Sequence, residues 1–291
     1  MHDGAASYSE KTDRQFILSS GTFQVPYQFK FSYKKMQDLK VPLLNTGFRK
    51  SCNNMSKLYF FRHAQASFMA DNYDKLSDHG EKQSEELGKY LVQKEFHFDK
   101  IFVGPLSRQR RTYEIVADVF SKNKRTIPEP LFVENLREHS GPEAMRYVFP
   151  KLREGNAEIK KLLQIAEENP ALKKRNHLLV FQYFMEEWAA GYIEVPEVES
   201  WATFRKNVKI GLAQVLAKTD RGETIGAFTS GGTISAITAE ALAIKEEQTI
   251  AKMNFSVRNT SFTSFLFSQN NFNLLSFNEL PHLEKEMITF V

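Results

Sequence analysis

An arginine and a histidine stand side by side at the end of the first strongly apolar run of the chain. The run Leu58-Tyr59-Phe60-Phe61 leads directly into Arg62-His63. An imidazole can attack phosphorus directly and hold the phosphoryl group as a phosphohistidine. An adjacent guanidinium offers forked hydrogen-bond donors to the phosphate oxygens. Alone, the dipeptide indicates no more than a surface loop, so its interpretation depends on the residues that accompany it.

Arg108 is the second candidate for an anion contact. It lies in the first turn of a predicted helix, where a cation opposes the helix dipole. The conflict disappears if an anion sits between the arginine and the helix, and phosphate commonly binds at helix N-termini. We therefore predict that Arg108 holds phosphate, whereas Arg110 and Arg111 form a solvated basic face.

A carboxylic acid completes the candidate chemistry. Glu138 follows the predicted strand 131–133 at short distance. A carboxyl group there could protonate a leaving alkoxide and later activate water, so that one residue serves both steps. Glu134 and Glu143 are nearby competitors for the same role.

The elements that must position these residues alternate between strands and helices, which is typical of an α/β sheet layered with helices. The predicted strands cover 58–62, 101–103, 131–133, 224–228 and a hairpin, 260–267 with 272–277, around Asn270-Asn271. The predicted helices begin near 77, at 104–105 with a proline in the first helical position, at 198 and at 233. We expect a three-layer α/β/α sandwich with a mostly parallel central sheet and a helical cap insertion over 143–190. Ligands of open α/β sheets bind beyond the carboxyl ends of the strands.

Residues 1–54 differ from the rest of the chain. They show no sustained helical or strand period, so we expect a poorly ordered extension before a domain over 55–291. Residues 1–57 hold nine Lys/Arg and four Asp/Glu, which leaves 30 Lys/Arg and 31 Asp/Glu for 58–291. The body is therefore not a basic nucleic-acid surface, and we expect no nucleic-acid partner.

Composition narrows the class of protein further. No run of eighteen apolar residues occurs, so no membrane span is expected. The first twenty residues hold no apolar core of a secretory signal. The single cysteine, Cys52, excludes an internal disulfide and a cysteine metal cluster, which suits the cytoplasm.

Several short motifs, taken in order, resemble those of the histidine phosphatase superfamily, also called phosphoglycerate mutase-like. Leu58–Ala66 resembles the RHG segment of the family, with Ala64 in place of the commonest glycine. Four further stretches resemble later family segments: 76–91, Gly104–Arg108 with Thr112, 136–138, and Glu199-Ser200 with Arg205. The resemblance implies that His63 is the nucleophile, that Arg62 and Arg108 hold phosphate, and that Glu138 is the acid/base.

The chain departs from the family pattern at Ser230. The stretch Phe228-Thr229-Ser230-Gly231-Gly232 resembles a segment that usually carries a second histidine at the position of Ser230. Serine keeps a hydrogen-bond donor but not the charge, and losing one donor of this kind costs on the order of 10²–10³ in turnover. The backbone amides of Gly231 and Gly232 can compensate in part.

The remaining candidates for substrate contacts are Gln65, Gly231, His139 and His282. His139 is next to Glu138, although a loop histidine is the plainer interpretation, and His282 resembles a family position that is mainly structural. No pair of histidines has a metal-binding spacing on one helix face, so we expect no metal and no cofactor. The resemblance further implies that the cap insertion selects the substrate, although its aromatic residues are better explained as a small core of the insertion.

These residues together predict a phosphomonoesterase that acts through a phosphohistidine on a small phosphorylated substrate. A mutase is less favoured, because the mutases of the family place Ser and then Trp-Asn after the histidine, where Ala66-Ser67-Phe68 stands here. The alternative is a degenerate phosphatase that binds a phosphorylated ligand or partner with little turnover, because Ser230 replaces histidine. Substrate identity and oligomeric state are left open.

Overall fold

The computed structural model describes residues 55–66, 74–269 and 271–290, so the extension predicted over 1–54 lies outside the described residues. Within those ranges, six strands form one sheet in the order β3-β2-β4-β1-β5-β6. The pairs β3/β2, β2/β4 and β4/β1 are parallel, whereas β5 and β6 are antiparallel. The strands are β1 (Ser56–Arg62), β2 (Lys100–Val103), β3 (Pro130–Phe132), β4 (Thr224–Thr229), β5 (Phe262–Ser268) and β6 (Asn271–Glu279). The prediction of a mostly parallel sheet is confirmed.

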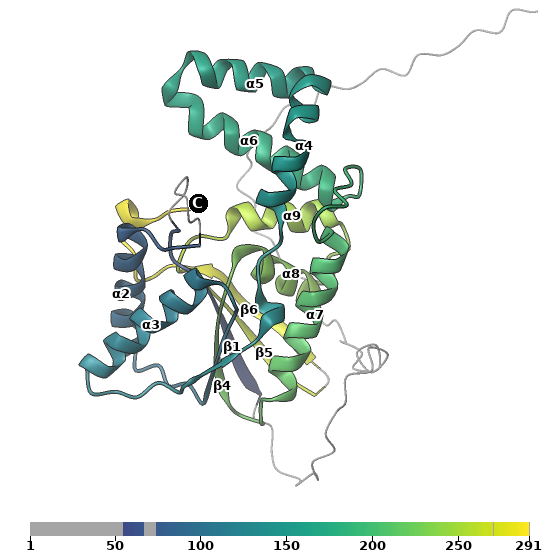
Figure 1. Ribbon diagram of the computed structural model, residues 1–291. Helices are drawn as coiled ribbons and strands as arrows, with labels where there is room; N and C mark the ends of the chain where they lie inside the picture. The colour runs from purple at the N-terminus through teal and green to yellow at the C-terminus, as the bar shows by residue number, and fades with distance from the viewer. Residues whose placement is uncertain (1–54, 67–73, 270, 291) are drawn as a thin grey trace, which may run out of the picture.

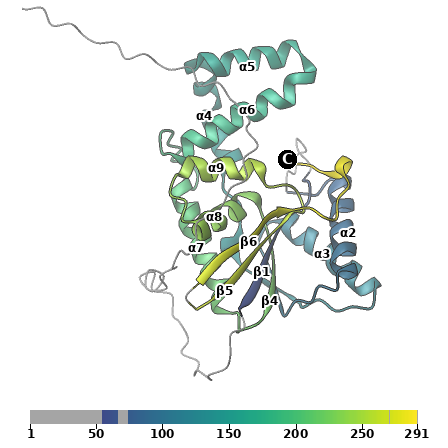
Figure 2. The same ribbon diagram turned by 180° about the vertical axis from the view of Figure 1, so that it is seen from behind.

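Helices cover both faces of this sheet, as the two opposite views show (Figure 1, Figure 2). One face carries α2 (Asp78–Gln93) and α3 (Ser107–Lys122), and the other carries α7 (Trp201–Ala217) and α8 (Gly231–Leu242), while α9 (Glu247–Ser256) packs against α8 (Figure 1). Successive side chains of a strand point to opposite faces. Accordingly, Phe61 packs in the core under α2 and α3, while Leu58 and Phe60 pack in the core under α7 and α8. The three-layer α/β/α sandwich is confirmed.

The segment predicted as a helical cap consists of α4 (Gly141–Gly155), α5 (Ala157–Glu168) and α6 (Pro170–Ala189). These helices project beyond one end of the sandwich (Figure 1). Their tip has a small core of its own, formed by Ile159, Leu163 and Val180. The end of α6 joins the main core, where Phe184 and Trp188 are buried.

Three predicted helix starts need correction: α7 begins at Trp201 rather than at 198, α8 begins at Gly231 rather than at 233, and α3 also begins at a different residue. Pro105 was predicted at the first helical position, but α3 begins at Ser107 with Leu106 as its N-cap. The chain uses Gly104 and Pro105 to leave β2, and the amide of Gly104 still bonds the carbonyl of Phe228. The sequence patterns made no prediction for α9, which the structure adds.

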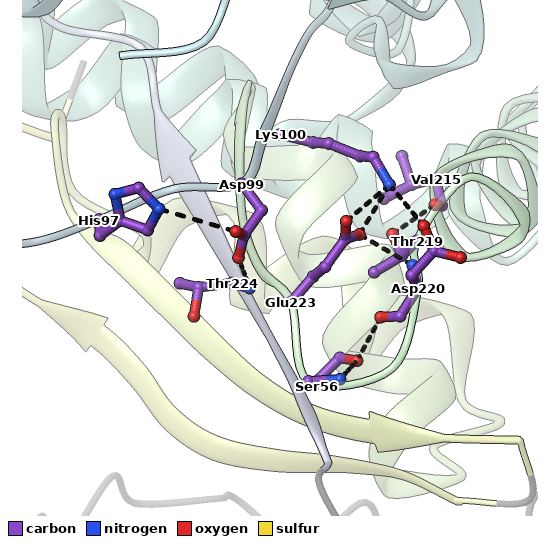
Figure 3. A network of polar contacts seen from close by, with 10 residues as sticks. Ser56, His97, Asp99, Lys100, Val215, Thr219, Asp220, Glu223 and Thr224 are labelled. Atoms are coloured by element: carbon purple, nitrogen blue, oxygen red, sulfur yellow. Dashed lines mark hydrogen bonds and ion pairs between the residues drawn. The ribbon is translucent and has the colours of Figure 1, made fainter. Parts of the chain in front are cut away.

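Polar side chains gather at both ends of the parallel strands. The carboxyl ends lead to His63, to the start of α3, to the short helix η1 (Glu134–Leu136) before Glu138, and to the start of α8. A different network lies at the amino ends (Figure 3), where the ammonium of Lys100 contacts the carboxylates of Asp220 and Glu223 at 3.2 and 2.8 Å.

Candidate active site

His63 is fixed by the sheet rather than by a loop. Its backbone amide donates to the carbonyl of Thr229 in the neighbouring strand at 2.9 Å. Its own carbonyl accepts from the side-chain amide of Asn259 at 3.2 Å. Only 4% of the residue is exposed. The histidine predicted as nucleophile is therefore a buried residue in a rigid setting at the carboxyl end of β1.

The surroundings of the ring select one tautomer of His63. Nδ1 lies 2.7 Å from the carbonyl oxygen of Ala64, which can only accept, so Nδ1 carries the proton. Nε2 then keeps its lone pair, and Nε of Arg108 donates to it at 3.1 Å. Burial, aided by the guanidinium groups of Arg108 and Arg62, holds the pKa of the His63 imidazole well below its ordinary value. The ring is neutral, with an unprotonated nitrogen among the arginines.

The side chain of Arg62 is held by backbone carbonyl groups. One terminal nitrogen donates to the carbonyls of Val257 and Phe290, the latter at 2.7 Å. The guanidinium also borders Gly231, where a Cβ atom would come within 3.4 Å of Nε of Arg62. The structure thus brings Arg62 together with His63 and with the start of α8.

Arg108 and the N-terminus of α3 already hold an anionic group of the chain. The carboxylate of Asp74 accepts from the Ser107 amide at 2.7 Å and from a terminal nitrogen of Arg108 at 2.8 Å. The arginine side chain is 8% exposed. The helix N-terminus and the arginine thus bind one anionic group, the carboxylate of Asp74, while phosphate binding by Arg108 stays a prediction. A cavity of about 400 Å³ lies beside this corner, with Asp74, Ser107, Arg110 and Arg111 in its wall; His63 and Arg108 do not line it.

Glu138 meets the N-terminus of the other helix at this edge, α8. One carboxylate oxygen accepts from the Gly232 amide at 3.1 Å and the other from the His139 amide at 3.1 Å. The side chain is 13% exposed. A Cβ atom at Gly232 would lie 2.2 Å from the carboxylate of Glu138, so a larger residue would require this carboxylate to shift. Glu138 is thereby held beside the strand end that carries Ser230.

His139 lies behind Glu138 in an aromatic cage. Its ring contacts the rings of Trp188, Trp201 and Phe204 at 6.3, 5.7 and 5.5 Å between centroids. Burial lowers the pKa of His139, although the neighbouring Glu138 opposes the shift. Nδ1 accepts from the Gly141 amide at 3.1 Å, and Nε2 meets the side-chain amide of Asn254 at 2.9 Å. His139 therefore links Glu138 to Gly141 at the start of α4 and to the aromatic residues around it.

Ser230 is buried at the end of β4 and is the N-cap of α8. Its hydroxyl oxygen accepts from the side-chain amide of Gln109 at 2.8 Å. Gly231, the next residue, approaches Asn254, whose side-chain oxygen would lie 2.6 Å from a Cβ atom. Ser230 and Gly231 therefore form the N-terminus of α8, and the carboxylate of Glu138 lies next to them.

Two of the predicted substrate contacts bond to neighbouring parts of the protein. The side-chain oxygen of Gln65 accepts from the hydroxyl of Ser77, the N-cap of α2, at 2.9 Å. Nε2 of His282 lies 3.0 Å from the hydroxyl of Thr260, whose amide bonds the carbonyl of His63. Burial lowers the pKa of His282 to about 4. His282 thus lies behind the backbone of His63.

Sequence patterns did not identify Asp74, Gln109 or Asn254 as parts of this edge. Each acts through a partner far along the chain, such as Ser230, which is 121 residues from Gln109. The sequence offered one signal for Gln109: it is a polar residue between Arg108 and Thr112, on the side of α3 that is buried. Within the described residues, no group of three or more His, Cys, Asp and Glu could hold a metal ion. None of the helices described there has the length and apolar character to cross a membrane.

The chain matches a known family profile and known folds. The profile of the histidine phosphatase superfamily (branch 1) matches residues 58–158 and 150–280. Bacillus stearothermophilus YhfR has a similar fold, with a TM-score of 0.55 at 19% identity over 79% of this chain and 100% of that one. A variant phosphoserine phosphatase from Entamoeba histolytica, in complex with phosphoserine, has a TM-score of 0.51 at 21% identity, with 79% and 100% covered.

Phosphoglycerate mutase from Bacillus anthracis is similar at a TM-score of 0.50 and 16% identity, with 79% of this chain and 95% of that one covered. No curated protein sequence matches the chain significantly. At these identities the solved structures establish a shared fold.

Proposed function

Because the chain belongs to the histidine phosphatase superfamily, we propose that it is a phosphomonoesterase that acts through a phosphohistidine on His63. One observation carries the proposal: Nε2 of His63 is unprotonated, buried, and 3.1 Å from Nε of Arg108. A nucleophile and a phosphate-binding group are therefore adjacent. An incoming phosphate would take over the arginine donors and release the lone pair of Nε2 for attack.

In the first step, Nε2 of His63 forms a bond to phosphorus while the bond from phosphorus to the ester oxygen breaks. The protonated carboxyl group of Glu138 gives its proton to the leaving alkoxide. The imidazole becomes positively charged, and the carbonyl of Ala64, 2.7 Å from Nδ1, stabilises that charge. We assign to Arg62, Arg108 and the hydroxyl of Ser230 the stabilisation of the phosphoryl oxygens, whose charge develops during the transfer.

In the second step, water attacks phosphorus and the bond to Nε2 breaks. Glu138 takes a proton from this water, inorganic phosphate leaves, and the neutral ring is restored. The contacts of Glu138 with the amides of Gly232 and His139 support this role, because they hold the carboxylate in one place for both steps. The substrate class is a small phosphate monoester, which the similar structure solved with phosphoserine also supports.

Trapping of the intermediate tests the proposal. Rapid quenching in alkaline detergent after mixing with a radiolabelled phosphate monoester, followed by peptide mapping at alkaline pH, should place acid-labile phosphate on His63. The His63→Ala variant should lose the label and about a thousandfold or more of the turnover. His177→Ala, a substitution on the exposed face of α6, is the control and should behave as the wild type.

The alternative, binding without turnover, predicts a different result from the same experiment. Calorimetry would detect binding of inorganic phosphate to the wild type, while neither label nor hydrolysis of p-nitrophenyl phosphate would be found. That combination would overturn the phosphatase proposal and leave a phosphate-binding domain.

A further inference from the structure

Gln109 is a fully buried glutamine whose side chain has one possible orientation. Its Oε1 accepts from the Leu106 amide at 3.1 Å, and its Nε2 donates to the carbonyl of Leu136 at 3.1 Å. Rotating the amide by 180° would set two oxygens against each other at Leu136 and two N–H groups against each other at Leu106. The backbone therefore decides which end of the amide faces Ser230, and it is the NH₂ end.

This orientation decides how the Ser230 hydroxyl is used. Since Nε2 of Gln109 donates at 2.8 Å, Ser230 accepts with one lone pair and keeps its own proton for another partner. Ser230 is the N-cap of α8, yet its side chain makes no capping bond, and the nearby Gly232 amide bonds Glu138 instead. Among the residues that the structure describes, no acceptor is found for this hydroxyl proton.

The backbone on either side of Ser230 contacts the residues proposed to carry out phosphoryl transfer. Ser230 directly follows Thr229, whose carbonyl binds the amide of His63, and it precedes by two residues the amide that binds Glu138. We propose that Gln109 is a positioning residue that turns the hydroxyl proton of Ser230 toward the phosphoryl group transferred to His63. This inference rests on the proposed phosphohistidine chemistry. In this proposal Gln109 acts only through the hydroxyl of Ser230, so losing either residue removes the same contribution to phosphoryl transfer.

Two substitutions of Gln109 separate orientation from simple packing. Gln109→Met keeps the length of the side chain but cannot donate, so the Ser230 proton is no longer directed. Gln109→Glu sets a carboxylate oxygen against the hydroxyl, so that Ser230 must donate to it and the proton is withdrawn from the phosphoryl group.

The measurements are kcat and KM for p-nitrophenyl phosphate, with inorganic phosphate affinity by calorimetry. Ser230→Ala should lower kcat by about 10²-fold with little change in KM. Gln109→Glu should lower kcat about as much, and Gln109→Met by about two- to tenfold. In the Ser230→Ala background neither substitution should cause a further loss, because their effect passes through the hydroxyl. The Gln109→Glu variant should also recover relative to Gln109→Met as the pH is lowered, since a protonated carboxyl group can donate again.

A second buried glutamine provides the matched control. Gln83 is also fully buried, and its amide donates to Met287 at 2.7 Å and Thr289 at 2.9 Å. Gln83→Met loses a similar set of hydrogen bonds, so its effect on kcat should be equal with and without Ser230→Ala.

The inference is overturned if Gln109→Met behaves like this control, with equal losses in both backgrounds. If Gln109→Glu does not fold, the paired comparison of Gln109→Met alone carries this test. Failure of the proposed function is recognised separately, because the wild type would then show neither turnover nor label. In that case the same variants are compared by phosphate affinity, in which Gln109 and Ser230 must again act non-additively.

Discussion

At the carboxyl ends of β1 and β4 the polar side chains are buried, whereas at the amino ends of the same strands they lie near the surface in a network of mutual contacts (Figure 3). His63 is 4% exposed at one end, while the side chain of Asp220 is 88% exposed at the other. Lys100 contacts Asp220 and Glu223, and the Glu223 carboxylate accepts from the Asp220 amide at 2.8 Å. These contacts at the amino ends of the strands hold the turn that leads into β4.

The electrostatic consequences of the two settings are opposite. Burial alone would lower the pKa of Lys100, but hydrogen bonds to Glu223 and Asp220 raise it, so its charge is stabilised. Burial and two guanidinium groups lower the pKa of His63, so its neutral, nucleophilic form is stabilised. Exposed ion pairs are screened by water and contribute little, whereas buried charges and dipoles interact strongly. Polar residues at the carboxyl end should therefore control function, and those at the amino end only stability.

The largest effect is expected at Gly232. Gly232→Ala introduces a Cβ atom 2.2 Å from the present position of Glu138, so the carboxylate must move away from the amide that holds it. Loss of a positioned general acid costs about 10²–10⁴-fold, and we expect kcat to fall by about 10²-fold or more. Steady-state kinetics below the unfolding temperature measure this. Gly155→Ala, where the added atom meets nothing within 4 Å, should retain wild-type kcat. An active Gly232→Ala variant would remove Glu138 from the reaction.

Arginine substitutions should distinguish Arg108 from its neighbours on α3. Arg108→Ala removes charged hydrogen bonds worth about 1.5–3 kcal/mol, so inorganic phosphate should bind about ten- to a hundredfold more weakly. Arg110 stacks on Phe132 and Arg111 pairs with Glu81, so alanine there should change phosphate binding little. Isothermal calorimetry on the three variants provides the comparison. Equal affinities would place the phosphate elsewhere.

The pH dependence of unfolding should report the buried histidines of the carboxyl end. The pKa of His282 falls to about 4 in the folded protein, against about 6.5 when unfolded. Between these values the unfolded chain binds more protons, so the free energy of unfolding should decrease as the pH falls from 6.5 to 4, by up to about 1.4 kcal/mol per pH unit for each such histidine. Urea unfolding of the wild type should therefore show a steeper slope against pH than His282→Gln. A slope that is unchanged in His282→Gln would refute the assignment.

The smallest effect is expected at the amino end itself. Lys100→Met breaks the contacts with Asp220 and Glu223, and a partly exposed pair of this kind is worth about 0–1 kcal/mol. Thermal unfolding should show a small loss of stability, and kcat should be unchanged. A marked fall in kcat would mean that the two ends of the sheet are coupled.

Much of the candidate active site was predictable because the positions of its residues depend on where strands end. His63 follows β1, Ser230 follows β4, and Glu138 follows β3 and η1, and parallel strands bring such positions to one edge of a sheet. Arg108 was predictable from its place in the first turn of α3. The start of α3 was predicted two residues early, because Pro105 is compatible with the loop as well as with a first helical turn.

Gln109, Asp74 and Asn254 were missed because nothing local distinguishes them from other polar residues. Gln109 looks like one member of the polar run 107–111, and only the burial of its face of α3 separates it from Arg110 and Arg111. Asp74 precedes α2 in the chain but bonds the start of α3. Such contacts depend on how two helices meet, which the polar pattern of either helix does not encode.

The amino-acid sequence by itself determined the strands, their two apolar faces and the order of residues at their ends, because these follow from short-range periodicity and from steric rules of the backbone. It thereby determined that a histidine, an acid and a serine share one edge. Only the tertiary structure decided the state of these groups: which nitrogen of His63 is unprotonated, which amide holds Glu138, and which way the Ser230 hydroxyl turns. The physical reason is that hydrogen bonds and burial act over a few ångströms in space, between residues as distant in sequence as Gln109 and Ser230.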